Sequence, residues 1–153
     1  MRRVVSLLLL AAAVSGLQAM QAPPEHGAHH VQAPDGLEWA PLGPTMSVAV
    51  LSGVPDQDGS PFVLRLKFAA GATVAPHWHP VDEHLTVLSG RLHMGMGDRF
   101  DKAAGSVLAP GAYAMMPASA IHFAWADDET VVQIHGVGPF TTNFVEPPPS
   151  RTP

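Results

Sequence analysis

Three potential metal ligands lie within seven residues of this sequence: His77, His79 and Glu83. The two histidines are two residues apart, so on a β-strand their side chains leave the same face. Pro80 follows and cannot donate a ladder hydrogen bond, which indicates that the chain turns there. Glu83 can then return on the next strand and direct its carboxylate at the same point. Two imidazoles and one carboxylate that converge in this way suit a divalent transition metal ion.

A fourth candidate ligand, His122, ends a second stretch of turn and strand signals that begins at Gly111. With these residues in place, the sequence resembles the cupins. The first cupin motif, G-x5-H-x-H-x3-E-x6-G, is matched at every position, and the second, G-x5-P-x-G-x2-H-x3-N, is matched in part. The matching residues are Gly71, His77, His79, Glu83 and Gly90 in the first motif and Gly111, Pro117 and His122 in the second.

The second motif departs from the family pattern at Ser119, where glycine is usual, and at Ala126, where asparagine is usual. These departures put a local turn and one polar contact in doubt, but they leave the candidate ligands in place. The resemblance implies an all-β, cupin-type double-stranded β-helix, or jelly-roll barrel, in which four ligands meet at one divalent ion. The ligands implied are His77, His79, Glu83 and His122.

A six-coordinate ion held by four protein ligands would keep two positions for water, dioxygen or a chelating substrate, and open positions distinguish a catalytic metal site from a structural one. Tetrahedral zinc, which would use all four ligands, stays an alternative. Nitrogen and carboxylate ligands suit iron, manganese, nickel, copper or zinc, and the order of affinities alone does not choose among them.

The elements that would position these ligands are predicted to be strands. Phe62, Leu64, Leu66 and Phe68 alternate with Arg65 and Lys67, which predicts apolar side chains toward the core and charged ones toward water. No stretch has helical periodicity. Strands at intervals of about ten residues, separated by turn signals, predict a closed sandwich or barrel. The expected strands are 39–42, 45–51, 62–68, 77–79, 83–89, 91–96, 107–108, 113–116, 121–125 and 130–135.

Composition favours a single folded domain. The chain has 153 residues, of which 46% are hydrophobic and 14% charged, which suits one domain with its own core. Proline and histidine clusters before residue 37 indicate a flexible leader rather than a metal site. The expected organisation is a signal peptide at 1–19, a leader at 20–36, the barrel at 37–146 and a Pro-rich tail at 147–153.

The N-terminus has the pattern of a secretory signal peptide. Arg2 and Arg3 precede an almost wholly apolar run, and Ala19 is the small residue before the expected cleavage site. We therefore expect a periplasmic or secreted protein with no stable membrane insertion after processing, and the alternative is an uncleaved anchor. The absence of cysteine excludes disulfides and thiolate ligands.

Charge excludes some classes of partner. The formal net charge is −5 and no basic run follows the N-terminus, which argues against nucleic acid and anionic membrane surfaces. The expected partner is a small-molecule substrate or ligand. A homodimer formed through sheet edges or faces is a further expectation from the resemblance.

Other residues have weaker signals. Trp78 and His84 each follow a candidate ligand on a strand and should point away from it, and His93 is interpreted as a surface histidine. Gln133 and His135 share one strand face and would either enter the barrel or meet solvent. Methionine fills irregular core space more often than it binds copper, so we expect four methionines to line the barrel. These are Met94, Met96, Met115 and Met116.

Three functions fit these features. The resemblance favours a metal-dependent enzyme that activates a small organic molecule toward dioxygen, a dioxygenase-type oxidoreductase, in which Glu83 could act as a base. The first alternative is a binding module for a small ligand or a metal, which predicts tight binding without turnover. The second is a metal-dependent isomerase or lyase with the same ligands and another pocket.

Overall fold

The computed structural model describes residues 29–145. Contacts divide the chain into two units, Met1–Val31 and Gln32–Pro153. Residues 29–31 are the described part of the first unit, and they form neither helix nor strand. The predicted signal peptide, the Pro-rich tail and the first part of the predicted leader lie outside the described residues. Within residues 29–145, no helix has the length and apolar character needed to cross a membrane.

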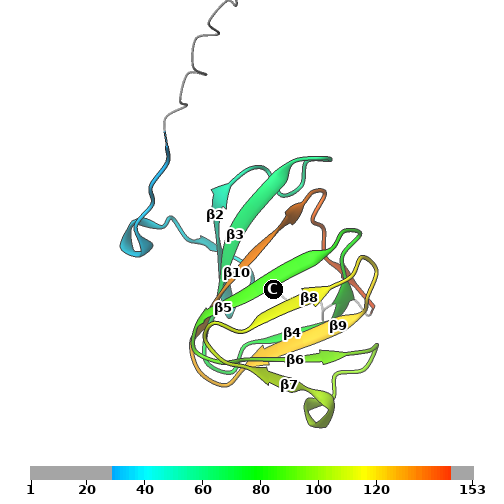
Figure 1. The fold of residues 1–153 in the computed structure, drawn as a ribbon. Coiled ribbons are helices and arrows are strands. Elements are labelled where there is room, and N and C mark those ends of the chain that lie inside the picture. Colours follow the sequence, from blue (N-terminus) through cyan, green and yellow to red (C-terminus); the bar gives the residue numbers. More distant parts are fainter. Residues whose placement is uncertain (1–28, 146–153) are drawn as a thin grey trace, which may run out of the picture. The chain divides into compact units, whose positions relative to one another are not determined.

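The second unit is built from strands in two antiparallel sheets (Figure 1). One sheet has six strands in the order β1-β2-β3-β10-β5-β8, and the other has five in the order β11-β4-β9-β6-β7. The strands are β1 Ala40–Pro41, β2 Met46–Ser52, β3 Pro61–Phe68, β4 Thr73–Trp78, β5 Glu83–Ser89, β6 Leu92–Met96, β7 Ser106–Leu108, β8 Tyr113–Met116, β9 His122–Ala126, β10 Thr130–Val137 and β11 Asn143–Phe144, and two short 3-10 helices are η1 Pro34–Gly36 and η2 Lys102–Ala104.

The all-β prediction is confirmed, and each expected strand has a counterpart. The strand that the sequence pattern did not indicate is β11, which has two residues and pairs with β4, and the two short 3-10 helices were not indicated either. A strand of that length has no alternation to detect, because the period-of-two signal needs about four residues.

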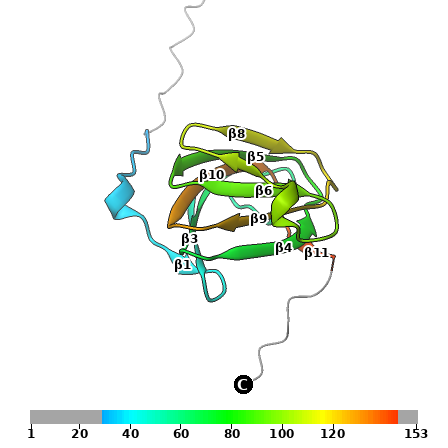
Figure 2. The same cartoon turned by 90° about the horizontal axis from the view of Figure 1, so that it is seen from below.

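The core lies between the inner faces of the two sheets, which face each other in Figure 2. On β3 the predicted alternation is confirmed: Phe62, Leu64 and Phe68 are buried, and Leu66 packs against the same cluster. Arg65 and Lys67 lie on the outer face of the sheet. The buried cluster continues on the other sheet with Leu92, Ala124 and Ala126.

Both glycines of the first motif are required by backbone conformation. Gly71 and Gly90 have φ angles of 77° and 73°, in a region that side chains with a Cβ atom disfavour. The Gly71 amide donates a hydrogen bond of 2.9 Å to the carbonyl of Ala126, and the Ala126 amide donates one of 3.0 Å to Ala72. The backbone of Ala126 therefore ties this turn to the end of β9, although Ala126 lacks the polar side chain usual at that position.

Candidate metal centre

The four predicted ligands lie at the ends of three strands. His77 is near the end of β4, His79 follows that strand, Glu83 begins β5 and His122 begins β9. His77 and His122 are directly opposed partners in the β4–β9 pair, so their side chains leave the same face. All four side chains are buried, with exposed fractions of 6%, 5%, 4% and 2%.

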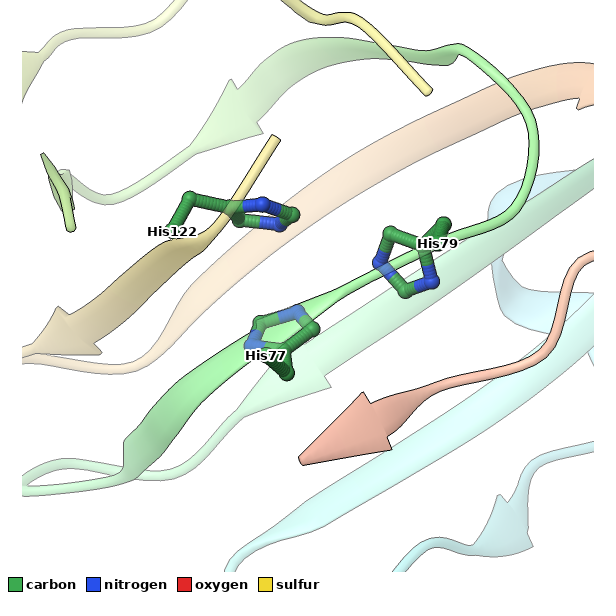
Figure 3. Close-up of side chains that lie close together, drawn as sticks. All are labelled: His77, His79 and His122. Carbon is green, nitrogen blue, oxygen red and sulfur yellow. The ribbon is translucent and has the colours of Figure 1, made fainter. Parts of the chain in front are cut away.

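The sequence prediction that three histidines come together agrees with their placement. Figure 3 shows the rings of His77, His79 and His122 turned toward one another, from β4, the connection after it, and the neighbouring β9. The ring centroids of His77 and His122 are 4.2 Å apart, and those of His77 and His79 are 5.0 Å apart. One ring nitrogen of each histidine lies within 4.8 Å of the corresponding nitrogens of the other two.

Each imidazole is held by a backbone carbonyl through its Nδ1 atom. The distances are 2.8 Å from His77 to Ala75 O, 2.9 Å from His79 to Thr141 O and 2.9 Å from His122 to Ala120 O. A carbonyl oxygen only accepts, so each Nδ1 atom must carry the proton and donate it. When the rings are neutral, every Nε2 atom therefore presents a lone pair.

Glu83 lies against two of these lone pairs. Its Oε2 atom is 3.1 Å from His122 Nε2 and 3.5 Å from His79 Nε2. Oε2 is buried and has no hydrogen-bond partner among the described residues. A carboxylate oxygen that faces imidazole lone pairs is unfavourable unless a cation or a proton lies between them.

Burial governs protonation in the metal-free site. Burial, with the neighbouring His122, lowers the pKa of His77 from 6.5 to about 4. Burial also lowers the pKa of His79, although the Glu83 charge opposes this shift. For His122 burial acts in the same direction, but the Glu83 carboxylate and the Ala120 carbonyl outweigh it and raise the pKa above its usual value. His122 is therefore the imidazole that would hold a proton beside Glu83 when no ion is bound.

The residues present fit a divalent transition metal ion. Three Nε2 lone pairs and one unpartnered carboxylate oxygen gather in a buried place, and the carbonyl contacts fix the ring orientations in the way that is usual behind metal-bound histidines. Glu83 is outside the mutually close trio, but its Oε2 atom is the nearest acidic oxygen to two members of it.

Two contacts fasten the turns that carry these ligands. The Asp82 Oδ1 atom accepts a hydrogen bond of 2.7 Å from the Ala118 amide. The Ser119 amide donates one of 2.8 Å to the carbonyl of His79. These two hydrogen bonds join the turn before Glu83 to the turn before His122. The role of Asp82 was missed from the sequence because no motif marks that residue.

Two aromatic residues near the centre were also missed. The Phe140 ring is stacked on His79 at a centroid distance of 4.1 Å and an angle of 22°. The Phe144 ring lies 5.8 Å from that of His77, and β11 pairs Phe144 with His77. Both follow β10 in a segment without periodicity, so the sequence offered only their apolar type as a signal.

The side chains of His84, Gln133 and His135 lie on the outer face of the six-stranded sheet. His84 points away from the centre, as expected, and its Nδ1 atom is 2.7 Å from the Tyr113 hydroxyl. Gln133 and His135 do not enter the barrel: Gln133 accepts a hydrogen bond of 3.2 Å from Arg65, and the His135 ring is stacked on His84 at 5.0 Å. An outer groove of about 570 Å³ runs past His84 and His135, away from the three histidines.

His93 and the methionines depart in part from expectation. His93 was expected to be a surface histidine, but its side chain is only 18% exposed. Its ring is stacked on Trp125 at 4.7 Å, and its Nε2 atom is 3.2 Å from an Asp127 oxygen. Met94 and Met116 belong to the core or pack against it, as predicted. The prediction is wrong for Met115, which is 47% exposed, because neighbours on a strand face opposite sides. Met96 has the inner-face position of β6 but is 55% exposed.

Comparison with solved structures supports the fold. The polyketide cyclase RemF from Streptomyces resistomycificus is 12% identical, with a TM-score of 0.66, over 80% of this chain and 89% of that chain. KdgF from Halomonas sp. is 20% identical, with a TM-score of 0.56, over 71% and 94%. An oxalate oxidase structure is 22% identical, with a TM-score of 0.52, over 68% and 57%. At these identities the likeness concerns the fold alone.

The family model gives the assignment. No curated protein matches the chain. The model of the ChrR Cupin-like domain matches residues 27–141, which is more than half of the sequence. This match covers β1 to β10 and all four residues of the candidate centre, and with the similar structures it confirms the jelly-roll prediction. The chain therefore belongs to the family of ChrR cupin-like domains.

Proposed function

We propose that this protein is a metal-dependent enzyme of the dioxygenase type that acts on a small organic molecule. The observation that carries the proposal is a set of three clustered imidazoles whose Nδ1 atoms are fixed by carbonyls, with the Nε2 atoms of His79 and His122 beside the unpartnered Oε2 atom of Glu83. A bound redox-active ion would supply electron transfer toward dioxygen and would polarise a substrate oxygen.

The side chains of the site would bind, orient and shield the reacting molecule. Phe140 and Phe144 flank His79 and His77, so they would exclude bulk water from that side. Glu83 Oε2 could accept a proton from a substrate hydroxyl, since no hydrogen bond from a described residue occupies it. His122 lies 3.1 Å from that oxygen and would stabilise the carboxylate's changing charge.

A second candidate is a module that binds a metal or a small ligand without turnover. The observation in its favour is the burial of all four residues, none of which is more than 6% exposed. Fold alone does not decide between the two, because one fold can serve many unrelated functions. A metal-dependent isomerase or lyase would need the same four residues.

Metal content tests the centre. Purified protein should carry about one divalent ion per chain, and His77→Ala and His122→Ala should each lose most of it. His84→Ala and His135→Ala are matched controls on the outer sheet face and should keep it. Full metal occupancy in a protein that lacks both His77 and His122 would refute the centre.

Dioxygen uptake tests the chemistry. Metal-loaded protein should consume dioxygen with a member of a panel of phenols, diketones and small acids, and His77→Ala should abolish uptake. Tight binding of a panel member without consumption of dioxygen or formation of product would refute the enzyme proposal and favour the binding module. Product formed without dioxygen would favour the isomerase or lyase.

The place of action is also part of the proposal. The apolar N-terminal run supports export, with a mature chain that begins at or near Met20. Mass spectrometry of exported material is the test, and an intact segment 1–19 in that material would refute processing. The homodimer stays a prediction that light scattering tests.

A further inference from the structure

Met96 lies beside the candidate metal centre at the point where the inner face meets solvent. It ends β6 and is the direct partner of His122 at the start of β9. Directly opposed side chains of an antiparallel pair leave the same face, with Cβ atoms about 5 Å apart. His122 is 2% exposed, whereas Met96 is 55% exposed. The inner face of β6 therefore reaches solvent directly beside His122.

Three further described side chains next to the centre are apolar. Met116 is the direct partner of Glu83 on β8 and belongs to the buried core. Phe140 is stacked on His79, and Phe144 lies near His77. A ligand that reaches the centre therefore meets thioether and aromatic surfaces, which favour an apolar body.

Four of the five cationic side chains among residues 29–145 have contacts away from the centre, and the fifth is exposed. Arg65 and Lys67 lie on the outer face of β3, Arg91 and Lys102 contact Asp128 and Asp127, and Arg99 is exposed on the loop after β6. No hydrogen bond or ion pair within residues 29–145 joins any Lys or Arg to the three histidines or Glu83. Among residues 29–145, the centre thus has a carboxylate of its own and no Lys or Arg side chain bonded to it that would balance a second negative charge.

We propose that the centre selects ligands with one negative charge on an otherwise apolar body and disfavours compact dianions such as small dicarboxylates. The inference rests on the proposed metal site. A divalent ion with the Glu83 carboxylate and three neutral imidazoles has a formal charge of +1, which one negative charge on a ligand neutralises. A dianion would leave a buried net charge without a partner, and such a charge is strongly unfavourable.

Binding to the zinc-loaded protein tests the inference without any measurement of activity. The probes are tropolone and oxalate, titrated by calorimetry at pH 8, where tropolone carries one charge on an apolar ring and oxalate carries two. Both chelate through two oxygen atoms. Relative to hydrated zinc, the wild-type protein should shift the preference toward tropolone by at least about tenfold.

A charge placed at Met96 should reverse that preference. Met96→Lys should raise oxalate affinity about tenfold, because an ammonium group would then lie beside the centre, and tropolone affinity should not rise. Met115→Lys is the matched control, since Met115 is 47% exposed on the outer face. Met96→Gln tests polarity without charge and should leave the preference as it is. Arg99→Ala should also leave oxalate affinity unchanged.

The outcomes separate this inference from the proposed function. If zinc-loaded wild-type protein shows no shift toward tropolone, or if Met115→Lys helps oxalate as much as Met96→Lys does, the inference is overturned and the metal site stands. Zinc content is measured on every sample. A wild-type protein that fails to retain zinc overturns both.

Discussion

At the scale of single residues, the candidate centre depends on how each imidazole is oriented. All three histidines share one arrangement: Nδ1 donates a hydrogen bond to a backbone carbonyl, so Nε2 faces the centre with a free lone pair. For His77 and His122 the carbonyl is two residues earlier in the chain, which is a local consequence of strand geometry. For His79 it comes from Thr141, 62 residues away. The first two rings are therefore oriented by residues just before them in the chain and the third by the segment that follows β10.

Glu83 allows catalysis to be separated from metal storage. Glu83→Gln keeps the shape of the side chain and removes its charge, which alters the Lewis acidity of a bound ion. Three histidines should still hold zinc, with affinity lower by about ten- to a hundredfold. Turnover per bound ion should fall far more than metal occupancy, with both measured on one reconstituted sample. Activity that simply follows occupancy would leave Glu83 a ligand and nothing more.

His77 gives the metal-free protein a sensitivity to acid. Its pKa is lowered to about 4 when folded, against 6.5 when unfolded, so the unfolded chain holds more protons between these values. Stability should therefore fall as pH drops from 6.5 toward 4, by up to about 3 kcal/mol from this residue. His79 adds to the loss. His122 acts in the opposite sense, because its raised pKa contributes stability that is lost as pH rises through the folded value.

Urea unfolding of metal-free protein at pH 7 and pH 4.5 measures this effect. His77→Asn should lose less stability than the wild type between the two values, whatever its stability at pH 7. An equal loss in both proteins would show that His77 does not retain its neutral form in the fold.

At the scale of elements, the turn before His122 contains a conformational strain. Ser119 has a φ angle of 66° and is the one non-glycine residue with positive φ among residues 29–145. Side chains disfavour this region by about 1 kcal/mol, and the Ser119 amide contact to His79 uses only the backbone. Ser119→Gly should therefore raise the free energy of unfolding by about 0.5–1 kcal/mol.

Ala118→Gly is the matched control for that turn. It gives the unfolded chain the same freedom at a position that has no positive φ, so it should lower stability. If chemical denaturation shows both variants destabilised to the same degree, strain at Ser119 is refuted.

Elements also show what the sequence could predict. Strand periodicity and turn residues are local properties, so the spacing of His77, His79 and Glu83 could predict that they converge. His122 was added through the resemblance to the second motif. The side of the sheet that Gln133 and His135 occupy depends on the register of β10 against β3 and β5, which local patterns do not fix. The same holds for the residues after β10, which reach His79 through a tertiary contact and were not predicted.

At the scale of the whole molecule, the candidate centre spans both sheets. His77 and His122 belong to the five-stranded sheet, and Glu83 begins a strand of the six-stranded one. His79 lies in the connection between them and is held by Thr141 from the segment that leads to β11. An ion bound by these residues would therefore link the two sheets and the C-terminal segment, in addition to the apolar core that already joins them.

Metal removal should accordingly destabilise the fold as a whole. An ion that binds only the folded state at a thousand times its dissociation constant adds about 4 kcal/mol, which for a domain of this size is on the order of 10–20 °C in unfolding temperature. Calorimetry with saturating zinc and then with a chelator measures the difference. His77→Ala should abolish the zinc dependence, and the outer-face variant His84→Ala should keep it. An unfolding temperature that zinc and the chelator leave unchanged would show that no ion links the two sheets.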